Sequence, residues 1–116
     1  MRGAGVKKMA WRLKKLPGRL EGEMAGAVTA SAVRAADTAR RLVPVDSGAL
    51  QRSIAHETAG LKAVVSASAP YAGIVEYGSS RSLPRPFMLP AAREGRDALL
   101  QEAGAAFSRA VKEVEG

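Results

Sequence analysis

The spacing of apolar residues changes at Pro44, and this change limits the chain to folds that combine helices with strands. From about Leu20 to Val43 the apolar and small residues recur at helical spacing, and Pro44 disfavours a helical conformation at the residue before it. Residues 61–68 instead alternate between apolar and more polar side chains, which is typical of a β-strand. The sequence therefore predicts a long helix that ends at Pro44, followed by strands.

Turn signals lie on both sides of the first predicted strand. Asp46 and Ser47 have side chains that bond nearby backbone N–H groups, and Gly48 tolerates a positive φ. Gly60 predicts a hairpin turn between the segment that contains Thr58 and the strand that follows. The order of elements after Pro44 thus predicts antiparallel pairing.

A second helix is expected at the end of the chain, beginning at about Pro90. Residues 71–77 fit either a turn of helix closed by Gly78 or a strand, and their spacing does not decide between the two. The predicted fold class is α+β: a long N-terminal helix, a small antiparallel β-sheet, and a C-terminal helix packed on the sheet.

The two long helices supply most of the expected core. The buried face of the first is predicted to hold Leu20, Met24, Ala27, Val28, Ser31, Ala35, Ala39 and Leu42. That of the second is predicted to hold Ala92, Leu99, Leu100, Ala103, Phe107, Ala110, Val111 and Val114. Aromatic residues make up only 4% of the chain, so we expect closely packed helices or a core that is completed against a partner.

All of the excess charge lies in the first 20 residues. They hold seven basic side chains and no acid, whereas the remaining residues hold eleven of each sign, so the net charge of +7 belongs to this segment. Its apolar residues fall at helical spacing and Pro17-Gly18 interrupts them, which predicts a short basic helix. We therefore divide the chain into a basic amphipathic arm, residues 1–20, and a single domain, residues 21–116.

The arm is the candidate contact with a partner or with DNA. Its candidate residues are Lys7, Lys8, Trp11, Arg12, Lys14, Lys15 and Arg19. Basic groups of this kind bind nucleic-acid phosphates, an anionic membrane surface or an acidic protein surface, including another copy of the chain, and they also occur in solubilising tails. The apolar stripe that includes Met9 and Leu13 favours a protein groove over DNA. We expect the domain to keep its secondary structure without the arm.

Several classes of protein are excluded by what the sequence lacks. There is no cysteine, so disulfide scaffolds and cysteine-ligated metal sites are excluded, and the one histidine, His56, has no nucleophile motif near it. No acidic spacing typical of a metal site is present, so neither a metal nor another cofactor is expected. No run approaches the ~20 apolar residues of a bilayer span. We expect a soluble, non-enzymatic protein made in a reducing compartment.

Three motifs follow the alanine-rich helix. They are Pro44-Val45-Asp46-Ser47-Gly48-Ala49-Leu50 with Ser53-Ile54, then Tyr71-Ala72-Gly73-Ile74-Val75-Glu76-Tyr77-Gly78, then Pro86-Phe87-Met88-Leu89-Pro90-Ala91. In this order they resemble the tail-completion family of long-tailed phages, whose members are labelled minor tail, tail-terminator or head–tail joining proteins and also occur in gene transfer agents. The resemblance covers roughly residues 24–113 and does not extend to the first 20 residues.

The resemblance implies a structural virion protein at the head–tail junction, assembled in the cytoplasm of the bacterial host. The resemblance implies that the protein forms a ring of six copies, which terminates the tail tube and joins it to the head-side connector or stopper protein. Its partners would be itself, the tail tube protein and the connector, with DNA passing through the lumen and no membrane. The alternative is a small basic nucleic-acid-binding module that acts through residues 1–20. A dedicated binder of that kind usually spreads its basic residues over the folded domain.

The residues of the three motifs are mostly structural in character. Pro86 and Pro90 bracket Phe87 and Met88, which we expect to anchor the loop to the core. Glu76 is the exception, because a carboxylate between Val75 and Tyr77 is expected to be partly desolvated. It then needs an arginine or several N–H donors, from its own chain or across a subunit interface.

Overall fold

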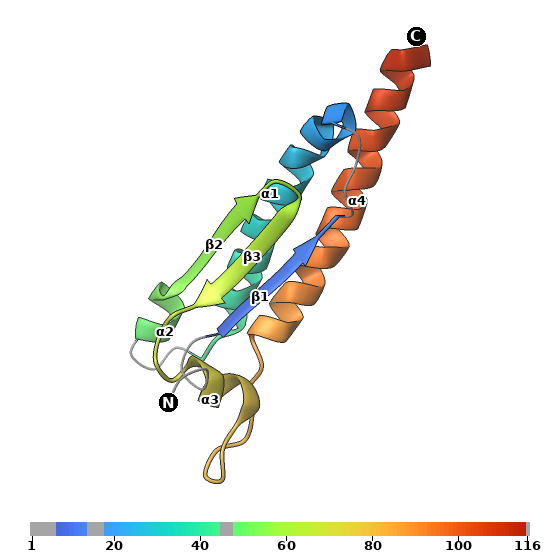
Figure 1. Cartoon of the computed structure of the whole chain (residues 1–116). Coiled ribbons are helices and arrows are strands. Elements are labelled where there is room, and N and C mark those ends of the chain that lie inside the picture. Colours follow the sequence, from blue (N-terminus) through green and yellow to red (C-terminus); the bar gives the residue numbers. More distant parts are fainter. Residues whose placement is uncertain (1–6, 14–17, 45–47, 116) are drawn as a thin grey trace.

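The computed structural model describes residues 7–13, 18–44 and 48–115. Its elements in chain order are β1 (Lys7–Arg12), α1 (Gly18–Leu42), α2 (Ala49–Arg52), β2 (Ile54–Ala59), β3 (Lys62–Ala67), α3 (Ala72–Tyr77) and α4 (Met88–Glu115). The two long helices lie side by side behind a three-stranded sheet, and α3 with the loop after it projects beyond one end of the sheet (Figure 1). The predicted α+β class is confirmed.

The sheet is antiparallel throughout, in the order β1-β3-β2. Strands β2 and β3 form the hairpin expected at Gly60, which has the left-handed φ of 59° that a tight turn of this kind requires. In β3 the predicted alternation is confirmed, since Ala63, Val65 and Ala67 are fully buried. These small side chains allow the sheet to lie close to the two helices.

Helix α1 is rich in alanine because it is packed on two sides, against the sheet and against α4. Four of its alanines are fully buried: Ala32, Ala35, Ala36 and Ala39. At Gly95 of α4 there is no room for a side chain, since an added Cβ would overlap the ring of Trp11 and lie 3.0 Å from the Cβ of Ala35. Small residues on both helices thus leave room for one large ring between them.

Two residues expected in the core are exposed, and for these the predictions are wrong. Leu42 at the end of α1 is 42% exposed, because the chain turns there and Val43 takes the buried position. Leu100 is 62% exposed, because its neighbour Leu99 occupies the side of α4 that faces the core. The side chains expected on that face from Phe107 to Val114 lie outside those that the structure describes.

Helix α4 begins at Met88, two residues before the predicted start. Pro90 is tolerated inside its first turn, because the N–H that proline lacks would have no intrahelical partner there. Residues 71–77, left open between helix and strand, form the short helix α3. The loop after it, residues 79–85, contains neither helix nor strand.

The basic segment is not a helix over Lys7–Arg12, so that prediction is wrong. This stretch is strand β1, and each of its six residues pairs with a residue of β3, from Lys7 opposite Ala67 to Arg12 opposite Lys62. Strand β1 pairs with the open edge of β3, and this pairing supplies hydrogen-bond partners for its backbone N–H and C=O groups. The helical spacing of the apolar residues gave no indication of this pairing. Lys14, Lys15 and the Pro17 break lie outside the described residues. The boundary at residue 20 stays a prediction, and the pairing of β1 argues against it.

Candidate interaction surface

Glu76 joins α3 to the beginning of α4. Its side chain is only 3% exposed, and its carboxylate accepts hydrogen bonds from the backbone N–H groups of Phe87 (3.0 Å), Met88 (2.8 Å) and Leu89 (3.0 Å). The first N–H groups of a helix have no partner within the helix and carry its positive dipole end. Of the two kinds of partner expected for this carboxylate, the structure therefore shows N–H donors within the same chain.

The loop between α3 and α4 is held by further backbone contacts. The Arg85 N–H donates to the Val75 carbonyl (2.8 Å), and Ser79 and Ser82 exchange hydrogen bonds across the loop. Gly78 has φ 79°, and a Cβ there would lie 2.8 Å from the Ser82 carbonyl oxygen. A short, tightly closed loop thus projects from the end of the molecule (Figure 1).

Phe87 and Met88, at the point where this loop returns to the fold, are fully buried. They pack in the same core cluster as Leu50 and Ile54. The loop is therefore anchored at its base both by two apolar side chains and by the hydrogen bonds to Glu76.

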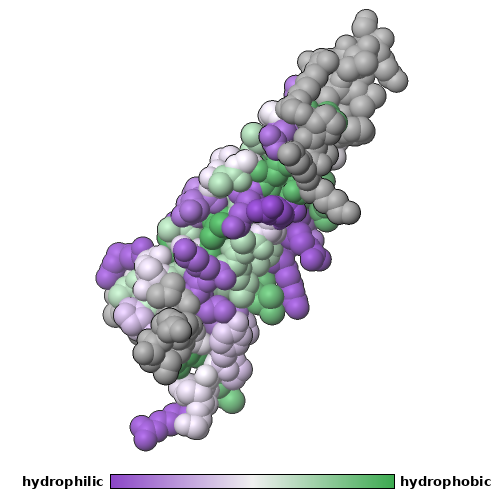
Figure 2. All heavy atoms as spheres, in the orientation of Figure 1, coloured by the Kyte–Doolittle hydropathy of each residue, from purple (hydrophilic) through white to green (hydrophobic). Residues whose placement is uncertain are grey.

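Large apolar side chains are exposed on this projecting end, which we call the tip and define as residues 71–85. Tyr71 is 39%, Ile74 47%, Tyr77 66% and Leu83 86% exposed. Figure 2 shows hydrophobic and hydrophilic residues together at the projecting end. Exposed apolar residues gathered in this way mark interaction surfaces.

The tip is also cationic. Arg81 and Arg85 are exposed, and no hydrogen bond or ion pair of their guanidinium groups is found within the described part of the chain. Lys7 lies against Tyr77, with its Nζ 4.3 Å from the ring centroid and close to the phenol oxygen. The tip's one carboxylate, Glu76, is buried, so the exposed charge there is positive.

The residues after Pro44 form the connection that holds the beginning of β2 against the end of α1. Gly48 has the left-handed φ of 83°, while Leu50 and Ile54 are buried at 3% exposure each. Asp46 and Ser47 of the predicted turn lie outside the described residues, and Pro44 is half-buried.

Two side chains that the sequence analysis did not single out complete this junction. Gln51 donates to the Arg40 carbonyl (3.0 Å), and Arg40 donates to the Ile54 carbonyl (3.1 Å). No local pattern identifies them, because each bond joins residues that are distant in the sequence.

Trp11, a candidate partner contact in the sequence analysis, is buried in this chain, so its role at a partner stays a prediction. It is 8% exposed, lies in the core cluster, and donates from Nε1 to the Ser31 hydroxyl (3.0 Å). Ser31 in turn donates to the Val28 carbonyl (2.8 Å). Trp11 is thus a structural residue that ties β1 to α1.

The remaining basic candidates divide between the two faces of β1 and the part of the chain that is not described. Lys8 and Arg12 are exposed, on the face of the sheet opposite the helices, and Lys7 is half-buried on the other face, beside Tyr77. Lys14, Lys15 and the side chain of Arg19 lie outside the described residues. The structure therefore brings two of the seven candidates together on one open face.

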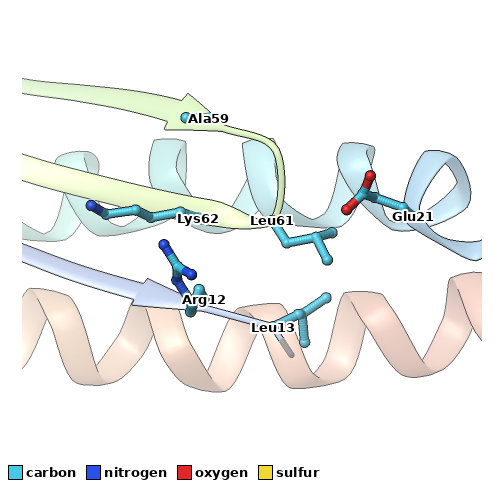
Figure 3. Close-up of a pocket in the computed structure, with 6 residues that line it drawn as sticks. All are labelled: Arg12, Leu13, Glu21, Ala59, Leu61 and Lys62. Atoms are coloured by element: carbon cyan, nitrogen blue, oxygen red, sulfur yellow. The ribbon is translucent and has the colours of Figure 1, made fainter. Parts of the chain in front are cut away.

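Arg12 lies beside a like charge on the next strand. It is the register partner of Lys62, and the two side chains line a small open pocket of about 220 Å³ with Leu13, Leu61, Ala59 and Glu21 (Figure 3). Like charges directly opposite each other on a sheet are destabilising unless an anion lies between them. No ion pair of Glu21 with either cation is found among the described residues.

The described residues contain no group of three His, Cys, Asp or Glu side chains that could hold a metal ion. His56 is exposed on β2. Within the same residues, neither long helix is apolar enough over its length to cross a membrane.

The comparison with protein families identifies the chain. The model of the HK97-gp10-like family, described as "Bacteriophage HK97-gp10, putative tail-component", matches residues 7–78, more than half of the chain. The chain belongs to this family. The match begins at β1 and ends at Gly78, so it includes the strand that the sequence analysis had set apart as an arm, and the Pro86–Ala91 motif lies beyond it. No curated protein and no solved structure matches the chain.

Proposed function

We propose that this chain is a structural protein that forms a ring, of six copies, where a phage tail meets the head. The ring terminates the tail tube and joins it to the head-side connector or stopper protein. The observation that carries this proposal is the chain's membership of a family of phage tail components. The particle is that of a long-tailed phage or of a phage-like gene transfer agent, and assembly takes place in the cytoplasm of the bacterial host.

The exposed surface of the chain supports a role in assembly rather than in catalysis. The tip carries four exposed large apolar residues on α3 and on the loop after it, and the base of this loop is fixed. An apolar projection of this kind is suited to contact with another protein. Different surfaces on one chain are needed for a ring, because each copy must meet its two neighbours through two different patches. One face of such a ring then meets the last ring of the tail tube, and the other face meets the connector.

Cryo-electron microscopy of particles made with and without the chain tests this proposal. With the chain present, we expect one ring of six copies at the junction and tails of uniform length joined to heads. Without it, we expect tails of abnormal length and unattached heads. Single copies at the junction, or copies distributed along the tail, would contradict the proposal.

A second candidate role is contact with the DNA that passes through the ring, and the neighbouring cations Arg12 and Lys62 favour it. With Lys8 they place three cations on the open face of the sheet, opposite the helices. Phosphate contacts give a steep loss of binding with salt, with a log–log slope of about −0.9 per contact on duplex DNA.

Titration of duplex DNA against salt tests this role. We expect Arg12→Gln to flatten the slope by about one contact, and Arg52→Gln, an exposed arginine on α2, serves as the matched control. A slope near zero for the unmodified protein, or equal effects of the two substitutions, would exclude a DNA contact on this sheet face.

A further inference from the structure

A groove lies between the exposed faces of α1 and α4. It has a volume of about 370 Å³ and is lined by Ala30, Val33, Arg34, Asp37, Ala98, Gln101 and Glu102. The alanines and Val33 give it an apolar floor, and Val33 is 40% exposed although it is a large apolar residue. This groove is on the helix pair, away from the tip at the end of the molecule.

The rim of the groove carries charges of both signs, and one of its carboxylates is unpaired among the described residues. Arg34 is engaged by Glu94 (3.1 Å), and Asp37 accepts a hydrogen bond from Arg40 (3.3 Å). Glu102 has no ion pair or hydrogen bond in the described part of the chain. An uncompensated carboxylate thus remains beside the apolar floor.

The tip combines an exposed apolar side chain with positive charge, and this combination complements the groove. Leu83 is 86% exposed, the most exposed large apolar residue described, and it lies between the unpaired cations Arg81 and Arg85. An apolar side chain flanked by positive charge therefore matches an apolar groove that has the carboxylate of Glu102 at its edge. Complementary charge of this kind directs association and excludes wrong partners.

We infer that the tip of one copy docks into the groove of the next copy, with Leu83 on the floor of the groove and Arg81 or Arg85 beside Glu102. The contact cannot form within one chain. Leu83 is almost fully exposed, and Ala98 is ten residues into α4, about 15 Å along the helix from its beginning near the tip. The tip that enters this groove therefore comes from a second copy.

This contact joins two different surfaces, so every copy uses its tip on one neighbour and its groove on the other. Contacts of this type close into a ring when the rotation between copies allows it. The inference rests on the proposed ring and names the surfaces that would hold it together. It also predicts that assembly weakens as salt is added, because the charged part of the contact is exposed to solvent.

Disulfide cross-linking tests the contact directly, since the chain has no cysteine of its own. A mixture of Leu83→Cys and Val33→Cys should give a cross-linked dimer on oxidation, and the doubly substituted chain should give a ladder of higher species. The matched control mixes Leu83→Cys with Glu57→Cys, which places the second thiol on the exposed face of the sheet. Equal cross-linking to both positions would overturn the inference.

Charge reversal gives an independent test in the full-length chain. Arg81→Glu and Glu102→Arg should each raise the Kd of assembly roughly tenfold or more, because each places like charges together. The two variants mixed together should regain assembly, since in an alternating ring each reversed tip meets a reversed groove. Thermal unfolding of each variant confirms that the exposed substitutions leave the fold unchanged.

The outcomes separate this inference from the proposed function. Rings in the electron microscope that show neither the cross-link nor the effect of charge reversal overturn the tip-to-groove contact and leave the ring intact. A chain that stays single in solution and at the head–tail junction contradicts the ring itself, and the contact with it. Selective cross-linking together with recovery in the mixture supports the contact.

Discussion

The middle of the molecule and its tip use apolar residues in opposite ways. In the middle, where the sheet meets the two helices, small side chains such as Ala35 and Gly95 bring the elements together around the ring of Trp11. At the tip, large side chains such as Tyr77 and Leu83 are left in solvent, although aromatic residues make up only 4% of the chain. The contact between the sheet and the two helices therefore uses many small residues, whereas the tip displays large ones.

This difference separates folding from assembly. Substitutions in the middle remove contacts that only the folded chain makes, so they should change the free energy of unfolding. Substitutions of exposed tip residues remove little that the folded chain needs, so they should change association instead. Glu76 belongs to both regions, because it is buried and yet fixes the base of the tip.

The largest effect is expected when residues 1–20 are removed. The deletion takes away β1 and with it Trp11, whose loss alone is typically worth about 3–5 kcal/mol for a buried aromatic. Domains of this size have total stabilities of roughly 5–15 kcal/mol, so we expect the truncated chain to be largely unfolded.

Far-ultraviolet circular dichroism and urea unfolding measure the effect of this deletion. Lys8→Gln with Arg12→Gln is the control, because it removes charge from the open face of the sheet and keeps the strand. A truncated chain with the parent's spectrum and stability would restore the boundary at residue 20 and make β1 a dispensable arm.

Glu76→Ala should have the next largest effect. It leaves three N–H groups at the start of α4 without their acceptor, at a cost of about 1–3 kcal/mol. Glu76→Gln retains one acceptor oxygen and should lose less. Urea unfolding measures the free energy of unfolding of the unmodified chain and of the two variants. Equal values for all three would show that the hydrogen bonds from Glu76 to α4 do not contribute to stability.

Gly95→Ala should destabilise the middle by overpacking. The new Cβ would overlap the Trp11 ring, and such overpacking costs roughly 1–3 kcal/mol, which exceeds the helix-propensity gain of about 1 kcal/mol. Gly104→Ala on the same helix is the matched control: nothing lies within 4 Å of its added Cβ, so it should be stabilising. If both substitutions stabilise in thermal unfolding, the Trp11 contact is not tight.

Much of this fold follows from local patterns in the sequence. The alternation in β3 and the turn at Gly60 are visible because they depend on residues a few positions apart. The end of α1 near Pro44 is visible for the same reason. The need of Glu76 for buried donors also follows from its neighbours, although which N–H groups supply them depends on the return of the chain at Phe87.

The parts that could not be predicted depend on contacts between distant segments. In β1, Met9 and Trp11 fit a strand period, while Met9 and Leu13 fit a helical one, so only the open edge of β3 decides between them. The role of Trp11 depends on the absence of a side chain at Gly95, far along the sequence. The groove on α1 and α4 is likewise invisible until the two helices are placed together.

A small effect that depends on pH is expected for Glu94, which links α4 to α1. A hydrogen bond from Arg34 holds the pKa of Glu94 below its ordinary value of 4.5. A carboxylate with a lowered pKa in the folded state stabilises the fold above the ordinary value, and this stabilisation is lost as the pH falls through the lowered value.

Glu94→Gln should therefore destabilise the chain near pH 7 by a few tenths to about 1 kcal/mol, the range of exposed ion pairs, and the difference should vanish in acid. Urea unfolding at several pH values measures it. A difference that persists at the lowest pH would mean that the charge of Glu94 is not its cause.

The smallest effect on stability is expected at the tip, and it completes the comparison. Leu83 is 86% exposed whereas Leu99 is 2% exposed, so Leu83→Ser should change the free energy of unfolding by no more than about 0.5 kcal/mol. Leu99→Ser, the matched substitution in the core, should cost several times as much, because it buries a hydroxyl and leaves a cavity. Assembly should show the reverse order when the Leu99 variant is measured under conditions that keep it folded. If Leu83→Ser instead unfolds the chain as readily as Leu99→Ser does, the tip is part of the fold, and its apolar residues are not displayed for a partner.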